Sequence, residues 1–231
     1  TGEVFTITEN DKKKIMKIHN VYRNMVAKGS FKLLPIAGRM LKLKWDENLA
    51  FIAEQAIKVC NLTLPDDAVF STTYATQPSY NSAYNKYPDS SSEDEMKIAK
   101  SQIKAWFDQY RYVDLCALKS NKSKGGQEIG HFQRLMNGLN DRVGCAIIKY
   151  SQDKFKYQLM ICFYGCHRMG KKMLYELGKV PGDKCKCGAD HRFKNLCNKQ
   201  ERHGDCSLES GRKEEAKKPF IKEVFDGIQN W

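Results

Sequence analysis

Long apolar runs, a signal-peptide pattern and the common nucleophile signatures are all missing from this chain of 231 residues. No hydrophobic run approaches the roughly 18–20 residues that a membrane-spanning helix needs. The N-terminal sequence TGEVFTITEN lacks the basic and apolar regions of a signal peptide. No G-x-S-x-G nucleophile elbow occurs, and neither RGD nor KGD is present. These absences argue against a transmembrane protein, a hydrolase with a nucleophile elbow and an integrin-binding loop of the RGD type.

Stacking platforms for nucleic acid are also absent, because the lysines do not alternate with aromatic residues and no known nucleic-acid-binding module occurs. The chain is nonetheless basic: 39 Lys and Arg residues against 27 Asp and Glu residues give a formal net charge of +12. We therefore expect no nucleic-acid partner, and an attraction to anionic surfaces such as glycosaminoglycans or phospholipid headgroups.

Cysteine is abundant: the chain has nine, and five of them fall within residues 166–206. Such density is typical of an oxidising compartment and of a segment held by disulfides. N-glycosylation sequons begin at Asn61 and Asn121, which is compatible with secretion. The odd count leaves one thiol free, paired between chains or paired with a residue upstream. The sequence predicts a secreted, extracellular protein.

Three amphipathic helices are predicted from apolar residues that recur every three or four positions. They are expected at about residues 9–27, 46–60 and 93–110. Thr8 and Asp11 suit a capping box for the first helix, and Asp46 suits the N-cap of the second. His19 adjoins the apolar stripe of the first helix and is interpreted as a packing residue. Residues 64–92, rich in Ser, Tyr, Asn, Pro and Asp, are predicted to form a long surface loop.

A β-hairpin is predicted from two β-rich runs, residues 142–150 and 155–164. Folding the chain about the midpoint between residues 153 and 154 places Cys145 opposite Cys162, within reach of a disulfide. The same register leaves apolar residues on both faces of the hairpin, so helices must cover both. The predicted fold is α+β: a three-layer α-β-α sandwich with an antiparallel central sheet, plus a disulfide-stapled C-terminal tail.

The tail begins at residue 165, and too little apolar sequence follows for a second core. The predicted division is therefore residues 1–164 and residues 165–231. The tail cysteines, whose connectivity the sequence leaves open, are Cys166, Cys185, Cys187, Cys197 and Cys206. A zinc site that also uses His191 and His203 is the alternative, but no clean C-x₂-C pair occurs. Cys60–Cys116 is a candidate second bridge, for which the sequence offers no geometric check.

Five short motifs follow one another along residues 10–165. They are His19-Asn20 with Tyr22-Arg23, Leu43–Ala50, Gly130–Phe132, Val143–Ala146 and Leu159–Gly165. As a set they resemble the signature segments of the CAP superfamily, which includes cysteine-rich secretory proteins, antigen 5 and pathogenesis-related-1 proteins. The tail resembles the extension of insect antigen-5-like proteins. The resemblance implies the same α-β-α fold and a salivary or venom allergen of an arthropod, recognised by antibodies of exposed hosts.

The resemblance also implies a central cleft in which two histidines and two acids hold a divalent metal. His131 matches the last histidine, but residues 20–130 contain no other histidine and residues 55–92 contain no glutamate. Gln109 stands where the second acid is expected. This set is too poor for zinc or copper, so no cofactor is expected. His131 and Gln109 are instead predicted to be ligand-binding residues of a degenerate cavity.

Three functions remain open. The favoured one is a non-enzymatic protein that binds a small hydrophobic mediator, such as a fatty acid, an eicosanoid or a sterol. The alternatives are a metal-dependent redox or hydrolytic enzyme, and a protein that docks to a host protein or an anionic glycan through its basic surface.

Overall fold

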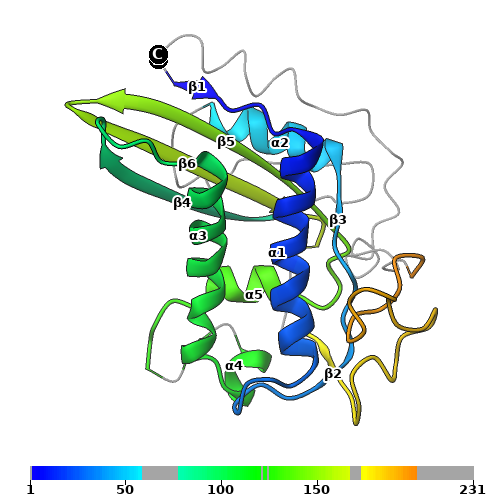
Figure 1. Ribbon diagram of the computed structural model, residues 1–231. Helices are drawn as coiled ribbons and strands as arrows, with labels where there is room; N and C mark the ends of the chain where they lie inside the picture. Colours follow the sequence, from blue (N-terminus) through cyan, green and yellow to red (C-terminus); the bar gives the residue numbers. More distant parts are fainter. Residues whose placement is uncertain (1, 59–77, 121, 124, 167–172, 202–231) are drawn as a thin grey trace, which may run out of the picture.

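A five-stranded sheet lies at the centre of the structure, a computed structural model that describes residues 2–58, 78–120, 122, 123, 125–166 and 173–201 (Figure 1). Its strands are β1 (Glu3–Val4), β3 (Lys44–Trp45), β4 (Ser79–Pro88), β5 (Arg142–Gln152) and β6 (Phe155–Tyr164). Four of them form the antiparallel order β1-β5-β6-β4, while β3 pairs in parallel with β5. The central sheet is therefore largely antiparallel, as predicted.

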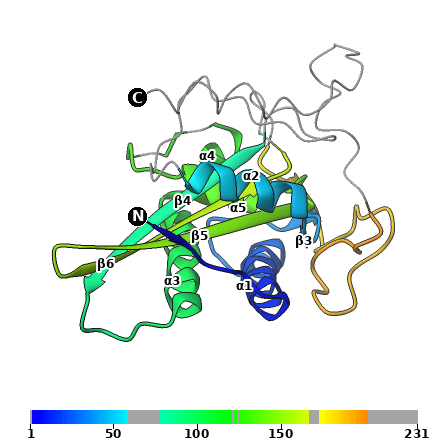
Figure 2. The same ribbon diagram turned by 90° about the horizontal axis from the view of Figure 1, so that it is seen from above.

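Helices cover both faces of this sheet. They are α1 (Glu9–Ala27), α2 (Glu47–Ile57), α3 (Glu95–Asp108), α4 (Leu115–Lys119) and α5 (Gly130–Met136), with a 3₁₀ turn, η1 (Gln109–Tyr112), after α3. Seen from above, α2 lies on one side of the sheet, and α1 and α3 lie on the other (Figure 2). Because α5 packs against α1, α3 and β4, it belongs to the second layer. The three-layer α-β-α sandwich is confirmed.

The hairpin has the predicted register, and Cys145 lies directly opposite Cys162 in it. The two cysteines form a disulfide across Cα atoms 4.0 Å apart, as predicted. The first strand runs two residues further than the sequence suggested, to Gln152, while the second has the predicted bounds. The turn consists of Asp153 and Lys154 alone, with φ of 51° and 65°. Positive φ at both central residues is the geometry of a tight two-residue hairpin turn.

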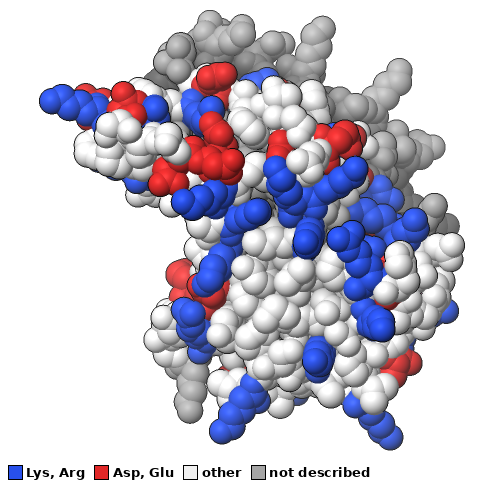
Figure 3. All heavy atoms as spheres, viewed as in Figure 1, with Lys and Arg blue, Asp and Glu red and all other residues white. Residues whose placement is uncertain are grey.

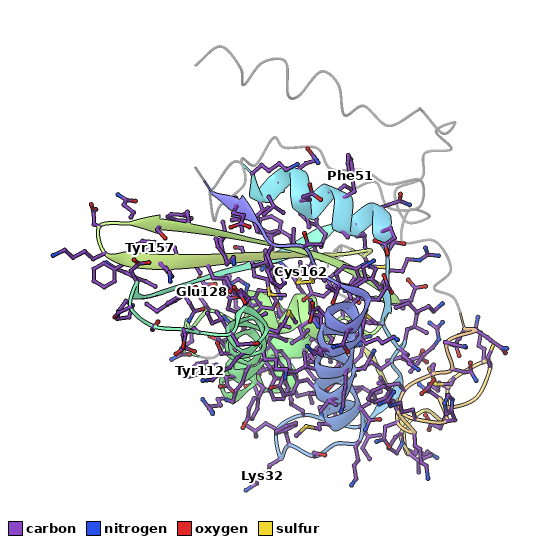
Figure 4. The ribbon with its side chains drawn as sticks, turned by 45° about the horizontal axis from the view of Figure 1, so that its top comes forward. Lys32, Phe51, Tyr112, Glu128, Tyr157 and Cys162 are labelled. Atoms are coloured by element: carbon purple, nitrogen blue, oxygen red, sulfur yellow. A yellow bond between two sulfur atoms is a disulfide. The ribbon has the colours of Figure 1, made fainter. Side chains whose placement is uncertain are left out.

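Two apolar cores result from the alternation of side chains along β5 and β6. The core facing α1, α3 and α5 includes Ile147, Met160 and the Cys145–Cys162 disulfide, and the core facing α2 includes Leu159 and Ile161. Figure 4 shows Cys162 between the sheet and the α1 layer, and Phe51 of α2 pointing away from the sheet. Burial on both faces explains why residues 143–148 and 159–164 of the hairpin contain no charged residue.

Two predictions of local structure are wrong. Residues 79–88, assigned to a surface loop, form the edge strand β4, which is paired with β6 along its whole length. The sequence does not predict this strand, because its outward-facing residues are polar or tyrosine and resemble those of a loop. Tyr84, for example, is 57% exposed. The Cys60–Cys116 bridge also fails, because Cys116 is a free, exposed thiol on the outer side of α4. Cys60 lies outside the described residues.

The described part of the tail packs against the main core. Leu174, Tyr175 and Leu196 are buried in the same cluster as α1 and α3. A short strand, β7 (Glu176–Leu177), pairs with β2 (Ala37–Arg39). The sequence therefore folds at least residues 173–201 onto the sandwich, and apolar burial adds to the effect of crosslinks.

A disulfide and two ion pairs fasten the tail. Cys185 is bonded to Cys197, Cys166 is also disulfide-bonded, and Cys187 is a free, exposed thiol. The nearly inaccessible carboxylates of Asp190 and Glu201 pair with Lys42 at 2.8 Å and Arg39 at 2.6 Å. Because Cys185 and Cys197 are bonded to each other, neither supplies a thiolate to zinc. His203 and Cys206 lie outside the described residues.

One row of α1 holds polar side chains inside the protein. Arg23 is fully buried and donates five hydrogen bonds of 2.7–3.1 Å to backbone carbonyls. Those carbonyls belong to Leu41, Leu135, Asn137 and Asn140. Asn20 exchanges two hydrogen bonds with the backbone of Leu43. These contacts fix α1 against the segment that precedes β3 and against the end of α5.

Gly144 is required where β5 passes under α2. A Cβ at this position would overlap the backbone nitrogen of Ala50 and lie 2.6 Å from the carbonyl oxygen of Asp46. We predict that Gly144→Ala lowers the free energy of unfolding by about 3 kcal/mol, because helix backbone cannot rotate away as a side chain can. Urea unfolding measures the loss. Gly125→Ala is the control, since its Cβ meets only the mobile end of Gln127. An unchanged midpoint for Gly144→Ala would contradict the packing described.

Candidate functional site

A chain of hydrogen bonds crosses the interior between α1 and the sheet, starting at His19. The His19 ring lies 2.8 Å from the Ile15 carbonyl through Nδ1 and 3.1 Å from the Tyr164 hydroxyl through Nε2. A carbonyl oxygen only accepts, so Nδ1 carries the proton and Nε2 accepts from the tyrosine. Both residues are completely buried. His19 is therefore a structural residue, as predicted.

The chain continues through Asn81 on β4 to His131 on α5. The Asn81 side-chain amide donates to the His131 carbonyl at 3.0 Å and lies 3.4 Å from the Tyr164 hydroxyl. Its oxygen lies 3.1 Å from Nδ1 of His131, which must donate. The proton of the neutral His131 ring is thus on Nδ1, and the Nε2 lone pair has no hydrogen bond within the described residues.

Trp106 and Gln109 surround His131 from the end of α3. The Trp106 ring stacks near His131, with centroids 6.1 Å apart, and its indole N–H donates to the Ser82 carbonyl at 3.1 Å. The Gln109 side-chain oxygen accepts from the backbone N–H of Phe132 at 3.0 Å. Gln109 therefore contacts the residue next to His131, so the predicted pair lies in one region of the structure. The side-chain oxygen of Gln109 is already used, because it accepts the hydrogen bond at the start of α5.

Burial keeps both histidines of this network neutral. Desolvation lowers the pKa of His19 to about 4, and the nearby cation of Arg23 adds to the effect. Desolvation also lowers the pKa of His131 to about 4, with a contribution from the charge of Arg134. The hydroxyl of Tyr164 has its pKa raised by burial. His19, His131 and Tyr164 therefore keep the same charge near neutral pH.

These residues do not fit a divalent metal. His131 offers one free imidazole nitrogen, while both nitrogens of His19 are used and the Gln109 oxygen holds a backbone N–H. Within the described residues, the one group of three metal-ligand types is Cys185, Cys197 and Glu201, and its two sulfurs form a disulfide. A single imidazole without carboxylates is far short of a zinc or copper site. The ligand-binding role of His131 and Gln109 stays a prediction.

A cleft of about 360 Å³ opens on the surface beside α1. Apolar side chains line it from three elements: Met16 on α1, Trp45 on β3 and Phe193 in the tail. Its cationic residues are Lys12, Lys13, Lys17, Lys42 and Arg192, and its acidic residues are Glu9 and Glu47. Lys and Arg side chains gather on this face of the molecule (Figure 3). Neither His131 nor Gln109 lines the cleft.

The charges in this cleft are not all neutralised. Lys12 bridges Glu9 and Glu47 at 2.7 and 2.6 Å, which accounts for both acids. Lys13, Lys17 and Arg192 form no ion pair with any described residue. The sequence carried part of this signal, since Lys13 and Lys17 are four apart on one helix face. It gave no sign that the tail would bring Arg192 to them.

Two further predictions concern membrane-spanning helices and glycosylation. No helix in the described ranges is long and apolar enough to cross a membrane. The sequon residues Asn61 and Asn121 lie outside those ranges, so their glycosylation stays a prediction.

Comparison with known protein families identifies the family of this chain. The family model described as the cysteine-rich secretory protein family, CAP, matches residues 16–166. The chain belongs to the CAP family. Among curated relatives, this CAP protein is 31% identical to the antigen 5 like allergen Cul n 1 of Culicoides nubeculosus over 155 residues, 67% of this chain and 68% of the relative. It is 29% identical to scoloptoxin SSD976 of Scolopendra dehaani over 190 residues, 82% and 84% of the two chains.

Solved structures share the CAP fold. One is the crystal structure of NaASP2 with Zn²⁺, with a TM-score of 0.62, 23% identity and coverage of 83% of this chain and 97% of that chain. Another is BmVAL-1, with a TM-score of 0.61, 21% identity and coverage of 83% and 95%. At these identities the likeness establishes the fold alone.

Acidification should destabilise this CAP protein through its neutral histidines. Their folded pKa of about 4 lies below the ordinary value of 6.5, so the unfolded chain binds more protons between these pH values. Their contribution is complete above pH 6.5 and is lost as the pH falls towards 4. We predict a loss of about 2–3 kcal/mol per histidine across this window, measured by urea unfolding at several pH values.

Paired variants isolate the contribution of one ring. His131→Gln, whose amide can still donate to Asn81, should flatten the pH dependence between pH 7 and the acid range. His191→Gln, at an exposed tail position, should leave it unchanged. Equal slopes for wild type and His131→Gln would show that His131 is already accessible to protons in the folded state.

The poor ligand set leads to a second prediction. One equivalent of zinc or copper should leave the ring signals of His131 unshifted in NMR spectra, and chelator should leave the melting temperature unchanged. Native mass spectrometry counts any bound metal. A stoichiometric ion that is lost in His131→Ala but kept in His191→Ala would restore the metal-dependent alternative.

Proposed function

We propose that this protein is a secreted, non-enzymatic CAP protein of a salivary or venom type that binds a small amphipathic anion, such as a fatty acid or an eicosanoid. The binding site is the cleft beside α1. The observation that carries the proposal is the combination of an apolar wall with three cations that have no ion-pair partner among the described residues.

The cleft has the composition that an amphipathic ligand requires. Its volume of about 360 Å³ lies at the lower end of the usual range for small-molecule sites. Met16, Trp45 and Phe193 would contact a hydrocarbon chain, and burying that chain supplies most of the affinity. A sterol, which has no charge, would leave the cations without a partner, so an anionic lipid is favoured over it.

The cations determine which end of the ligand binds where. Lys13 and Lys17 are exposed on successive turns of α1, and Arg192 approaches from the tail. A carboxylate placed between them gains charge-assisted hydrogen bonds without breaking an existing ion pair. The pairs Lys12–Glu47 and Lys42–Asp190, in contrast, hold the walls of the cleft in place.

The relatives support the setting. Several curated relatives carry names that denote venom proteins or allergens, including venom allergen-1 of Aedes aegypti, 27% identical over 199 residues. Two disulfides in the described residues fit an oxidising, extracellular compartment. Exposure of a host to such a secretion would make the protein an allergen, with host antibodies as further partners.

The same cations also support a second candidate function, docking to an anionic glycan. Three exposed cations on one face could follow a row of sulfate groups. Such binding would need no apolar wall, and it would weaken steeply with salt. The metal-dependent enzyme is not favoured by any arrangement in the described residues.

Titration with oleate tests the proposal, with cholesterol as the uncharged comparison and a heparin fragment as the glycan. We predict saturable binding of oleate, weakened about tenfold in Lys17→Gln and in Arg192→Gln, because each removes one charged partner. Phe193→Ser should weaken it through lost apolar contact. Lys194→Gln, a neighbouring exposed lysine outside the cleft, is the matched control.

The outcomes separate the candidates. Heparin binding that is lost in Lys17→Gln but insensitive to Phe193→Ser would replace the lipid by a glycan. Oleate binding that is unaffected by all three cleft variants, or equal affinity for cholesterol, would contradict the proposed site.

A further inference from the structure

The guanidinium of Arg134 on α5 has no hydrogen-bond or ion-pair partner in the part of the chain that the structure describes. Its side chain forms no hydrogen bond and no ion pair with the described residues, and the one side-chain donor that reaches its backbone carbonyl is Asn140, at 3.0 Å. A guanidinium carries five N–H donors in a rigid fork. Leaving all five without an acceptor among the described residues is unusual for a side chain that is largely covered.

Arg134 is held in a partly buried position. Burial lowers the pKa of Arg134, because the charged form is less well hydrated there. Its guanidinium folds back over Gly130, where a nitrogen lies 3.1 Å from the place that a Cβ would occupy. The absence of a side chain at residue 130 thus makes room for the cation. The contrast with Arg23 is sharp, because that buried guanidinium uses its donors on four carbonyls.

A cavity of about 500 Å³ lies against this guanidinium. Its lining includes Lys122, whose ammonium has no ion pair among the described residues, and Asn137, whose side-chain oxygen is already used by the N–H of Leu139. The amide nitrogen of Asn137 remains available as a donor. Glu128, which is exposed, is the acidic residue of the described lining, and its charge acts to raise the pKa of Arg134 against the larger effect of burial. The cavity therefore presents unused donors and positive charge.

We propose that this cavity binds the phosphate or sulfate group of a small organic anion, with Arg134 as its principal ligand. Two parallel N–H groups of the guanidinium match two oxygens of a tetrahedral oxyanion. Lys122 supplies a second positive charge and Asn137 a neutral donor. A bare oxyanion fills a small part of about 500 Å³, so the remaining space accommodates the organic part of the ligand.

This site is separate from the cleft of the proposed function. The cleft is formed by α1, β3 and the tail, whereas the cavity is formed by α5, Ser79 at the start of β4, residues 122 and 123, and residues 126–129. The two share no residue. Each can therefore be tested while the other serves as the control.

Calorimetric titration at constant ionic strength tests the proposal with three probes: sodium sulfate, glucose 6-sulfate and glucose 6-phosphate. We expect both sugar esters to bind more tightly than inorganic sulfate. Arg134→Gln should weaken them about 10- to 100-fold, because it removes a charged two-point contact. Arg134→Lys, which keeps the charge but not the fork, should lie between. Arg192→Gln, in the other cleft, should have no effect.

Two further measurements distinguish a loss of binding from a loss of folding. Since the Arg134 side chain bonds to none of the described residues, Arg134→Gln should keep or raise the melting temperature, whereas loss of a structural arginine would lower it. The charge of Arg134 contributes to the lowered pKa of His131, so sulfate ester binding should raise that pKa in an NMR titration. Arg134→Gln should raise it without ligand.

The results separate this site from the proposed function. Sugar-ester binding that survives Arg134→Gln, or that is lost in Arg192→Gln, would overturn the assignment of the cavity. Absence of saturable binding by all three probes would overturn it as well, and equal affinity for inorganic sulfate would remove the organic part of the ligand. None of these results affects oleate binding at the cleft, which Arg134→Gln should leave unchanged.

Discussion

The hydrogen bonds of Arg23 are the constraint on which the rest of the structure depends. Burial lowers the pKa of this guanidinium to about 9, yet it keeps its charge at neutral pH, and it meets no carboxylate within salt-bridge distance among the described residues. Backbone carbonyls solvate it instead: Leu41 before β3, and Leu135, Asn137 and Asn140 at and after the end of α5. A buried charge of this kind is tolerated only if its donors are satisfied, so the two chain segments cannot move independently of α1. The position of α5, and with it His131 and Arg134, follows from this arrangement.

The polar side chains that connect α1, β4 and α5 are engaged in the same way. Asn20 holds Leu43, His19 holds Tyr164, and Asn81 joins Tyr164 to His131. Each member uses its donors on its neighbours, which leaves the interior few means of binding a ligand. Binding chemistry is therefore expected where cations lack partners, at the cleft beside α1 and at the cavity next to Arg134. In this CAP protein the motif of the first helix serves to build the fold.

Sequence alone predicts the layers well, because its strongest patterns are each compatible with one local structure. The hairpin register follows from a two-residue period and fixes the Cys145–Cys162 pair, and the capping box at Thr8 and Asp11 marks the start of α1. The strand β4 is missed because an edge strand with polar and tyrosine residues facing outward resembles a loop. The functional surfaces depend on long-range contacts that no local pattern contains. The tail brings Arg192 to α1, and the absence of a described partner for Arg134 depends on the positions of residues far away in the sequence.

The central claim is that the histidines of the CAP motifs are neutral, structural members of one buried network. Long-range ¹H–¹⁵N NMR correlations of the imidazole rings at neutral pH test it most directly, because they report the tautomer of each ring. The account predicts that His19 and His131 are both neutral with the proton on Nδ1, donated to the Ile15 carbonyl and to Asn81. A proton on Nε2 of His131, or a charged ring at pH 7, would contradict the network and return His131 to the chemistry of an active site.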